Sequence, residues 1–188
     1  MGAASLVELA VRASTCTACR LSETRTKVVF GTGTADSGLL VIGEGPGRDE
    51  DLSGEPFVGR SGQLLDKLIF EELALTRASF YIANVVKCRP PGNRDPAPDE
   101  IAACSGYLDA QVAALDPRVV VTLGNVATRV LLATDLGITS LRGRTHEWRG
   151  RVLIPTFHPA YALRGGGVVV AQMRADLVRA KLALAAHR

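Results

Sequence analysis

Four cysteines form the pattern that most directly indicates chemistry in this sequence. Cys16 and Cys19 make a C-x2-C pair, and Cys88 and Cys104 make a looser C-x15-C pair far along the chain. Thiolates with such spacing suit a zinc ion or an iron–sulfur cluster. Because zinc ribbons usually supply two close C-x2-C pairs, the loose second pair favours a cluster. Four unrelated buried cysteines are the alternative, since free cysteine is often buried.

The glycine-rich segment at residues 43–59, GEGPGRDEDLSGEPFVG, is a second candidate for chemistry. It lacks the Lys-Ser/Thr pair of a phosphate-binding loop, and no GxGxxG pattern fits it, so we do not expect a nucleotide site. The segment is a strand-ending turn rich in carboxylates, a pattern that is also typical of a solvated acidic loop. These carboxylates are Glu44, Asp49, Glu50, Asp51 and Glu55.

The elements that would position these residues alternate between strands and helices. Apolar runs predict strands at 39–43, 80–86, 118–123 and 152–157, and amphipathic patterns predict helices at 3–13, 61–75, 99–115, 125–133 and 171–186. Ser61 and Asp99 are expected to cap the second and third of these helices. The alternation predicts an α/β fold with a parallel sheet covered by helices on both faces. Most of the unusual residues follow the first, second and fourth strands, so they should form one site at the carboxyl ends of the strands.

Length and composition indicate one folded domain over residues 1–188. Hydrophobic residues make up 47% of the chain, which argues against disorder. The net charge of +3 does not by itself predict nucleic-acid binding. No apolar run approaches the roughly 18 residues of a transmembrane helix, and the first residues lack the basic start of a signal peptide. We therefore expect a cytoplasmic protein whose cysteines are reduced or bind metal.

Several segments, taken together, resemble the motifs of the family 4 uracil-DNA glycosylases, which contain an iron–sulfur cluster. GEGPG, its acidic continuation and GEPFVGRSGQLL are similar to the first motif of this family, and YIANVVKCRPPGNRDPAPDEIAAC is similar to its second block. LRGRTHEW and IPTFHPAYALR are similar to its last two. The cysteine spacing matches the cluster ligands of the family. The resemblance runs from about residue 13 to about residue 185.

This resemblance implies a three-layer α/β/α sandwich with a central four-stranded parallel sheet. It implies a monofunctional DNA repair enzyme that hydrolyses the N-glycosidic bond of deoxyuridine, releases free uracil and leaves an abasic site. Such an enzyme acts on uracil-containing DNA, single- or double-stranded, and flips the nucleotide into a pocket. The resemblance also implies a [4Fe-4S] cluster on the four cysteines, which we interpret as a structural staple between distant segments. We expect a monomer that makes no membrane contact.

The resemblance implies three catalytic residues. Glu44 follows the first strand and would stabilise the cationic sugar and orient or activate a water molecule. Glu50 resembles a second family carboxylate, which would act either as the water-activating base or as a wall against the methyl group of thymine. His158, directly after the fourth strand, would hydrogen-bond uracil O2 and stabilise the developing anion.

Three further residues are expected to bind the base. Asn84, at the end of the second strand, would accept a hydrogen bond from uracil N3–H and donate one to O4, a pattern that cytosine reverses. Phe57 would stack on the flipped base, because a flat ring gives stacking that tolerates different sequences. Backbone amides around Gly45 are further candidates for contact with the base.

The segment after His158 resembles a loop that enters the minor groove and fills the space left by the base. The family often has a leucine in this segment, whereas this chain has Ala162 between Tyr161 and Leu163. The sequence therefore leaves the identity of the inserted residue open.

Two other functions compete with hydrolysis. The first is a protein that traps uracil-DNA covalently, as a related group does through a histidine in an insertion near the third cysteine. Here the residues after Cys88, RPPGNRDPAPDE, contain no histidine and no such insertion, which disfavours that function. The second is an electron carrier built on the cluster, which leaves GEGPG, Asn84 and His158 unexplained.

Overall fold

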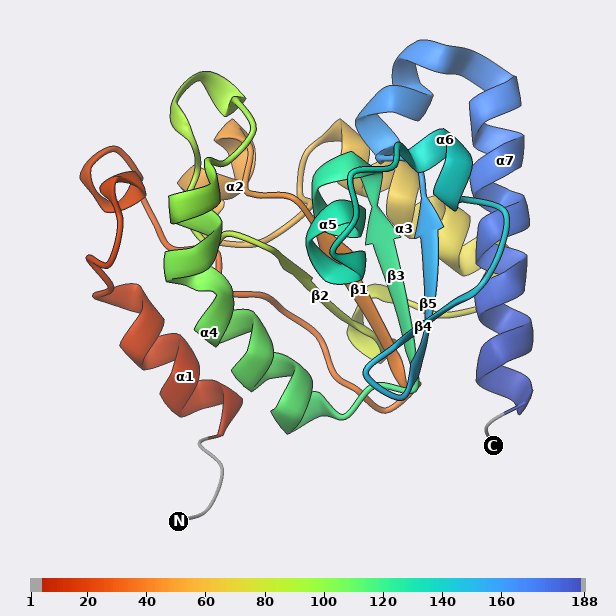
Figure 1. Cartoon of the computed structure of the whole chain (residues 1–188), viewed down its shortest axis with the longest axis horizontal. Helices are drawn as coiled ribbons and strands as arrows, with labels where there is room; N and C mark the ends of the chain where they lie inside the picture. Colours follow the sequence, from red (N-terminus) through yellow and green to blue (C-terminus); the bar gives the residue numbers. More distant parts are fainter. Residues whose placement is uncertain (1–4, 187–188) are drawn as a thin grey trace.

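The computed structural model describes residues 5–186 and contains one five-stranded sheet (Figure 1). The strands lie in the order β2-β1-β3-β5-β4. Their bounds are β1 Leu39–Gly43, β2 Tyr81–Asn84, β3 Val119–Leu123, β4 His146–Trp148 and β5 Arg151–Thr156. The first four strands in this order pair in parallel, which confirms the predicted four-stranded parallel sheet. β4 adds an antiparallel edge that was not predicted, because its three residues, HEW, contain no apolar run.

Helices cover both faces of the sheet, as a three-layer α/β/α sandwich requires (Figure 1). The α-helices are α1 Leu6–Ser14, α2 Arg48–Ser53, α3 Arg60–Leu73, α4 Pro98–Leu115, α5 Gly124–Leu132, α6 Ile138–Leu141 and α7 Pro159–Ala186. Short 3-10 helices are η1 Arg20–Glu23, η2 Arg77–Ser79 and η3 Pro91–Asn93. α3 and α7 pack on one face of the sheet, and α4 and α5 pack on the other, with α1 lying against α4.

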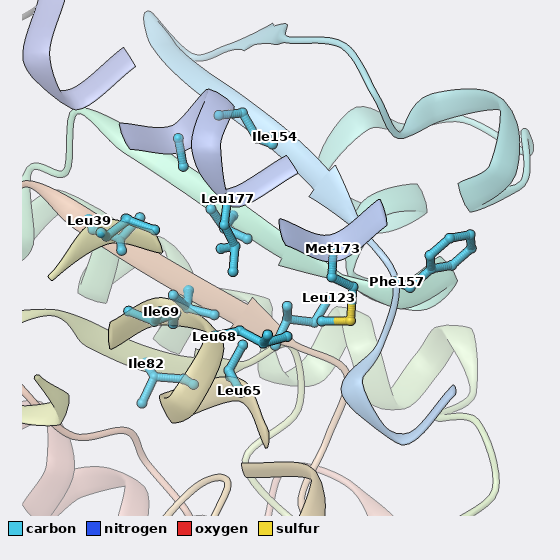
Figure 2. Close-up of a cluster of buried hydrophobic side chains, with 14 of the residues drawn as sticks. Leu39, Leu65, Leu68, Ile69, Ile82, Leu123, Ile154, Phe157, Met173 and Leu177 are labelled. Carbon is cyan, nitrogen blue, oxygen red and sulfur yellow. The ribbon is translucent and has the colours of Figure 1, made fainter. Parts of the chain in front are cut away.

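The core divides between the two faces because successive strand residues point to opposite sides. Leu39 and Val41 of β1 belong to the cluster under α3 and α7, whereas Leu40 and Ile42 belong to the cluster under α4 and α5. Figure 2 shows the first cluster, in which leucines of α3 and Met173 and Leu177 of α7 lie over the strands. All five residues of β1 and of β3 are buried, so the apolar runs mark strands covered on both faces.

Both predicted helix caps are wrong. Gly59 caps α3 and Ala97 caps α4, so Ser61 and Asp99 lie inside the first turns of those helices. The Asp99 carboxylate accepts hydrogen bonds from Arg20 instead. α1 begins at Leu6, capped by Ser5, and includes Ser14; residues 3 and 4 of the predicted helix lie outside the described residues.

The last helix begins twelve residues earlier than the predicted start at residue 171, since α7 runs from Pro159 and bends at Gly166, whose φ is 68°. Three consecutive glycines, at 165–167, have low helix propensity and hid this first part of the helix in the sequence. As a result, the segment after β5 turns directly into a helix at the carboxyl edge of the sheet. None of the helices within residues 5–186 combines the length and apolar character needed to cross a membrane.

Candidate active site

A cavity of about 720 Å³ opens at the carboxyl ends of the parallel strands. It is lined by residues that follow β1, β2, β3 and β5, which is where open α/β sheets bind ligands. The six residues expected to act on the base or the sugar all line this one cavity: Glu44, Gly45, Glu50, Phe57, Asn84 and His158.

Glu44 lies in the turn that leaves β1, and the end of β2 fixes this turn. The amide of Val85 donates to the carbonyl of Gly43 at 2.9 Å, and the amide of Val86 donates to the carbonyl of Glu44 at 3.1 Å. A side chain at Gly45 would come within 2.8 Å of the Val86 side chain, so a larger residue there would have to displace Val86. Burial, and to a smaller extent the nearby Asp95 carboxylate, raises the pKa of Glu44 to about 7. A carboxyl group with a pKa near neutrality can serve as a general base.

Glu50 lies in α2 and is held by backbone amides. Its Oε1 accepts hydrogen bonds from the amides of Val58 at 3.1 Å and Gly59 at 3.2 Å. The next residue, Asp51, is buried and accepts the amide of Thr26 at 2.9 Å. These two carboxylates therefore connect α2 to flanking segments, and the acidic run is not simply a solvated loop.

Phe57 directly precedes these two amides and has an unusual backbone conformation. Its φ is +57°, in the left-handed region that non-glycine residues rarely adopt. The side chain is buried, and the centroid of its ring lies 5.9 Å from that of His158, with the two planes inclined by 32°. Such strain persists only where the surroundings impose it, and it clusters at functional sites.

Asn84 is the last residue of β2 and presents a buried acceptor without a partner. The residue is 1% exposed, and within the described residues its Oδ1 accepts no hydrogen bond. A side chain at Gly43 would come within 2.4 Å of this oxygen and 2.5 Å of the Phe57 ring, so glycine lets both groups face the cavity. Leaving a buried acceptor unpaired costs about 1–3 kcal/mol, so a donor from a ligand would be favoured here.

His158 follows β5 and is neutral around pH 7. Burial, and to a smaller extent the nearby positive charge of Arg164, lowers its pKa to about 4. Its Nδ1 accepts the amide hydrogen of Ala160 at 3.2 Å, so the ring proton of the neutral form resides on Nε2. Gly124 allows the close packing of the imidazole, since a side chain there would lie 3.1 Å from the His158 Cβ. The ring thus offers one N–H donor to the cavity.

The four cysteines line a second, small apolar cavity, and none of them forms a disulfide. They come from three segments: the turn between α1 and η1, the loop after β2, and α4. Arg25 donates to the Cys88 sulfur at 3.2 Å, and the amide of Lys87 donates to the Cys104 sulfur at 3.3 Å. N–H donors of this kind stabilise thiolate ligands of a metal.

The four cysteines surround one common cavity and do not form a compact site for a single metal ion. Within residues 5–186, no three His, Cys, Asp or Glu side chains converge closely enough to hold a single metal ion. All four sulfur-bearing residues nevertheless line the same cavity. Burial raises the pKa of the Cys88 and Cys104 thiols, although the Arg25 and Lys87 charges oppose this rise at each one. The donor set of four sulfurs suits the metals expected from the spacing.

Residues 30–179 match the model of the uracil DNA glycosylase superfamily. The chain belongs to this superfamily. It is 48% identical over 155 residues to a type-4 uracil-DNA glycosylase of Thermotoga maritima, an alignment that covers 81% of this chain and 80% of that protein. A type-4 uracil-DNA glycosylase of Archaeoglobus fulgidus is 41% identical over 167 residues, covering 85% and 83% of the two chains. One of Sulfurisphaera tokodaii is 42% identical over 167 residues, covering 85% and 76%. The family predicted from the motifs is confirmed.

In the segment of the glycosylase after His158, exposed and buried side chains alternate over residues 161–163. Ala162 is 2% exposed and packs into the core, whereas Tyr161 and Leu163 are 47% and 45% exposed. The Tyr161 ring lies against Phe157 and lines the cavity, with a distance of 5.1 Å between ring centroids. Leu163 is therefore the apolar side chain of this segment that is exposed and lies outside the cavity lining.

Other residues line the glycosylase cavity that the sequence did not single out, among them Arg94, Asp95 and Asn125. Arg94 and Asp95 belong to the proline- and glycine-rich loop after β2, and the position of that loop after a strand was their one signal. Asn125 sits in the first turn of α5, where its Oδ1 accepts the amide of Ile138 at 2.8 Å. Nothing in its local sequence distinguishes it from an ordinary helical residue.

Proposed function

We propose that this glycosylase hydrolyses the N-glycosidic bond of deoxyuridine in DNA, releasing uracil and leaving an abasic site. The observation that carries the proposal is the buried, unpaired Oδ1 of Asn84 beside the Phe57 ring. In a flipped uracil, N3–H donates to this oxygen and O4 accepts from the Asn84 amide nitrogen. Cytosine offers an acceptor at N3 and a donor at N4, so it would leave the same groups unsatisfied.

The two ends of the breaking bond would meet different residues. As the bond breaks, the sugar becomes positive and uracil departs as an anion. The Glu44 carboxylate stabilises the sugar and takes a proton from the water whose oxygen bonds to C1′. The neutral His158 keeps its Nε2 proton and donates a hydrogen bond to uracil O2, where negative charge develops.

The remaining cavity residues would hold the substrate. Phe57 stacks on the uracil ring, and backbone amides around Gly45 contact the base. The exposed Leu163 is our candidate for the side chain that fills the space left in the DNA. We propose that both single- and double-stranded uracil-containing DNA enter this cavity.

We further propose that Cys16, Cys19, Cys88 and Cys104 hold a [4Fe-4S] cluster. Their common cavity and the N–H donors to Cys88 and Cys104 support this ligand set. Such a cluster joins its thiolate ligands covalently, so here it would tie three distant segments together. Four free thiols fit a reducing compartment, and we propose that the protein works as a monomer in the cytoplasm.

Release of uracil from a labelled oligonucleotide tests this function. Wild-type protein should release uracil from a deoxyuridine strand and no base from matched cytosine or thymine strands. Asn84→Ala should slow single-turnover release by roughly 5- to 150-fold, corresponding to about 1–3 kcal/mol for a bidentate base contact. Gln63→Ala, which removes an exposed amide of α3, is the matched control and should leave the rate unchanged. A wild-type-like rate for Asn84→Ala would exclude Asn84 as the reader, and a stable protein–DNA adduct without uracil release would indicate a trapping protein.

A further inference from the structure

Glu50 is the carboxylate of α2 that reaches across to the segment carrying Phe57. One oxygen, Oε1, accepts both the Val58 and the Gly59 amides. The other oxygen lies against Gly47, where a side chain would come within 2.7 Å of it. Because Gly59 is the N-cap of α3, these bonds join the start of α3 to α2 directly after Phe57.

The conformation of Phe57 needs such support on both sides. Before Phe57, the Arg77 guanidinium donates to the carbonyl of Pro56. At Phe57 itself, a side chain on Gly62 would come within 1.6 Å of the carbonyl oxygen, so α3 packs directly on this peptide. After Phe57, the Glu50 bonds fix the next two amides. Together these contacts impose the positive φ that turns the ring toward the cavity.

Glu44 and Glu50 differ in what their oxygens contact. Within residues 5–186 the Glu44 carboxylate accepts no hydrogen bond, and it lines the cavity, where water and the sugar can reach it. The Oε1 atom of Glu50 already has two donors. A carboxylate oxygen that accepts two backbone amides is suited to holding structure, because taking up a proton would weaken both bonds.

We propose that Glu50 is a positioning residue, which clamps the Val58 and Gly59 amides so that the Phe57 ring stacks on the flipped base, while Glu44 alone activates the water. This inference rests on the proposed excision of uracil and assigns a distinct task to a residue of that site. Its central consequence is that Glu50 needs an oxygen acceptor and does not need a negative charge.

The conservative variant Glu50→Gln distinguishes a structural role of Glu50, as a clamp, from a role as the catalytic base. In Glu50→Gln the amide oxygen can still accept both backbone amides, so single-turnover uracil release should stay within about threefold of wild type. Glu50→Ala should lose roughly 10- to 100-fold, because the ring is no longer held, a loss on the scale of a misplaced binding group. Glu44→Gln should lose about 10²- to 10⁴-fold, as expected for a positioned base. Glu55→Gln, the same change at an exposed carboxylate of the same loop, is the control. A Glu50→Gln variant as inactive as Glu44→Gln, or an active Glu50→Ala, would overturn the proposal.

A double-mutant cycle with Phe57 tests whether the clamp acts through the ring. In a Phe57→Ala background, Glu50→Ala should cost less than about threefold, because no ring remains to be positioned. An equal loss with and without Phe57 would show that Glu50 acts by another route.

Amide hydrogen exchange at residues 58 and 59 tests the clamp independently of activity. Both amides should be protected from exchange in wild type and in Glu50→Gln, and both should exchange fast in Glu50→Ala. If wild-type protein released no uracil, the proposed function would fail, whereas unprotected amides in wild type would refute the clamp itself.

Discussion

At the scale of single residues, burial acts on Glu44 and His158 in opposite directions. A buried site disfavours charge, so it raises the pKa of the carboxyl to about 7 and lowers the pKa of the imidazole to about 4. At neutral pH the imidazole is uncharged throughout, and Glu44 titrates. In the proposed mechanism the active form has an ionised Glu44 and a neutral His158, and this form predominates only above the pKa of Glu44.

The rate of uracil excision should therefore rise with pH through an acid limb near pH 7. Asp95 contributes to the raised pKa of Glu44, so Asp95→Asn should lower that pKa and move the limb of kcat/KM toward lower pH. Asp135→Asn, at an exposed site with no part in the cavity, should leave the limb in place. A limb that stays put or moves to higher pH in Asp95→Asn would contradict the assignment to Glu44.

At the scale of elements, the sequence predicted strands better than helix ends. The apolar run 39–43 coincides with β1 because a strand buried on both faces needs apolar residues at every position. Glu44 and His158 could be placed because each directly follows such a run. Asn84 lies within the run 80–86, and β2 ends at this residue, two residues before the end of the run. The caps of α3 and α4 could not be predicted, because neither Gly59 nor Ala97 has a side chain that caps a helix. Their backbone amides donate instead to the Glu50 and Glu100 carboxylates.

Glu100 holds the loop after β2 in place through contacts with Arg94 and Ala97, and no local sequence pattern reveals these contacts. Glu100 is fully buried in the first turn of α4 and accepts the Ala97 amide at 2.8 Å. It also pairs with Arg20 at 2.9 Å and with Arg94, which lines the active cavity. One carboxylate thus joins the residue after Cys19 to the wall of the base pocket. The Arg94 pairing holds the pKa of Glu100 at about 2, well below its usual range.

Glu100→Gln should destabilise the protein more than Asp99→Asn, the same kind of change at the exposed carboxylate that also pairs with Arg20. Removing the charge from a buried, fully hydrogen-bonded carboxylate should lower the free energy of unfolding by about 1–3 kcal/mol, measured by urea denaturation. Asp99→Asn removes the other, exposed partner of Arg20 and should cost less than about 1 kcal/mol. Because the pKa of Glu100 is depressed in the folded state, its contribution is complete above pH 4.5 and is lost as pH falls toward about 2. Equal losses for the two variants would show that burial of Glu100 adds nothing.

At the scale of the whole molecule, the two cavities share one short segment of chain. Asn84 faces the base pocket, and Cys88, four residues later, faces the cysteine cavity. Between them lies Lys87, a fully buried lysine whose ammonium donates to the Asn84 carbonyl at 2.7 Å and to Gln111 at 2.6 Å. Its backbone amide donates to the Cys104 sulfur. Lys87 therefore contacts both a cysteine of the second cavity and Asn84, the residue that we propose reads the base.

Loss of one of the proposed cysteine ligands should consequently affect the distant pocket as well as metal binding. Cys104→Ala should lose iron and visible absorbance, lower the urea midpoint, and slow uracil release in the fraction that remains folded. Ser105→Ala, at the exposed neighbouring residue of α4, should retain iron, stability and rate. Iron content, unfolding and single-turnover rate are measured on the same preparations, so that an effect on the rate can be compared at equal folded fraction.

A colourless wild-type protein that holds one zinc and no iron after anaerobic purification would reject the cluster. A Cys104→Ala protein that loses iron but keeps its wild-type rate would instead reject the coupling through residues 84–88.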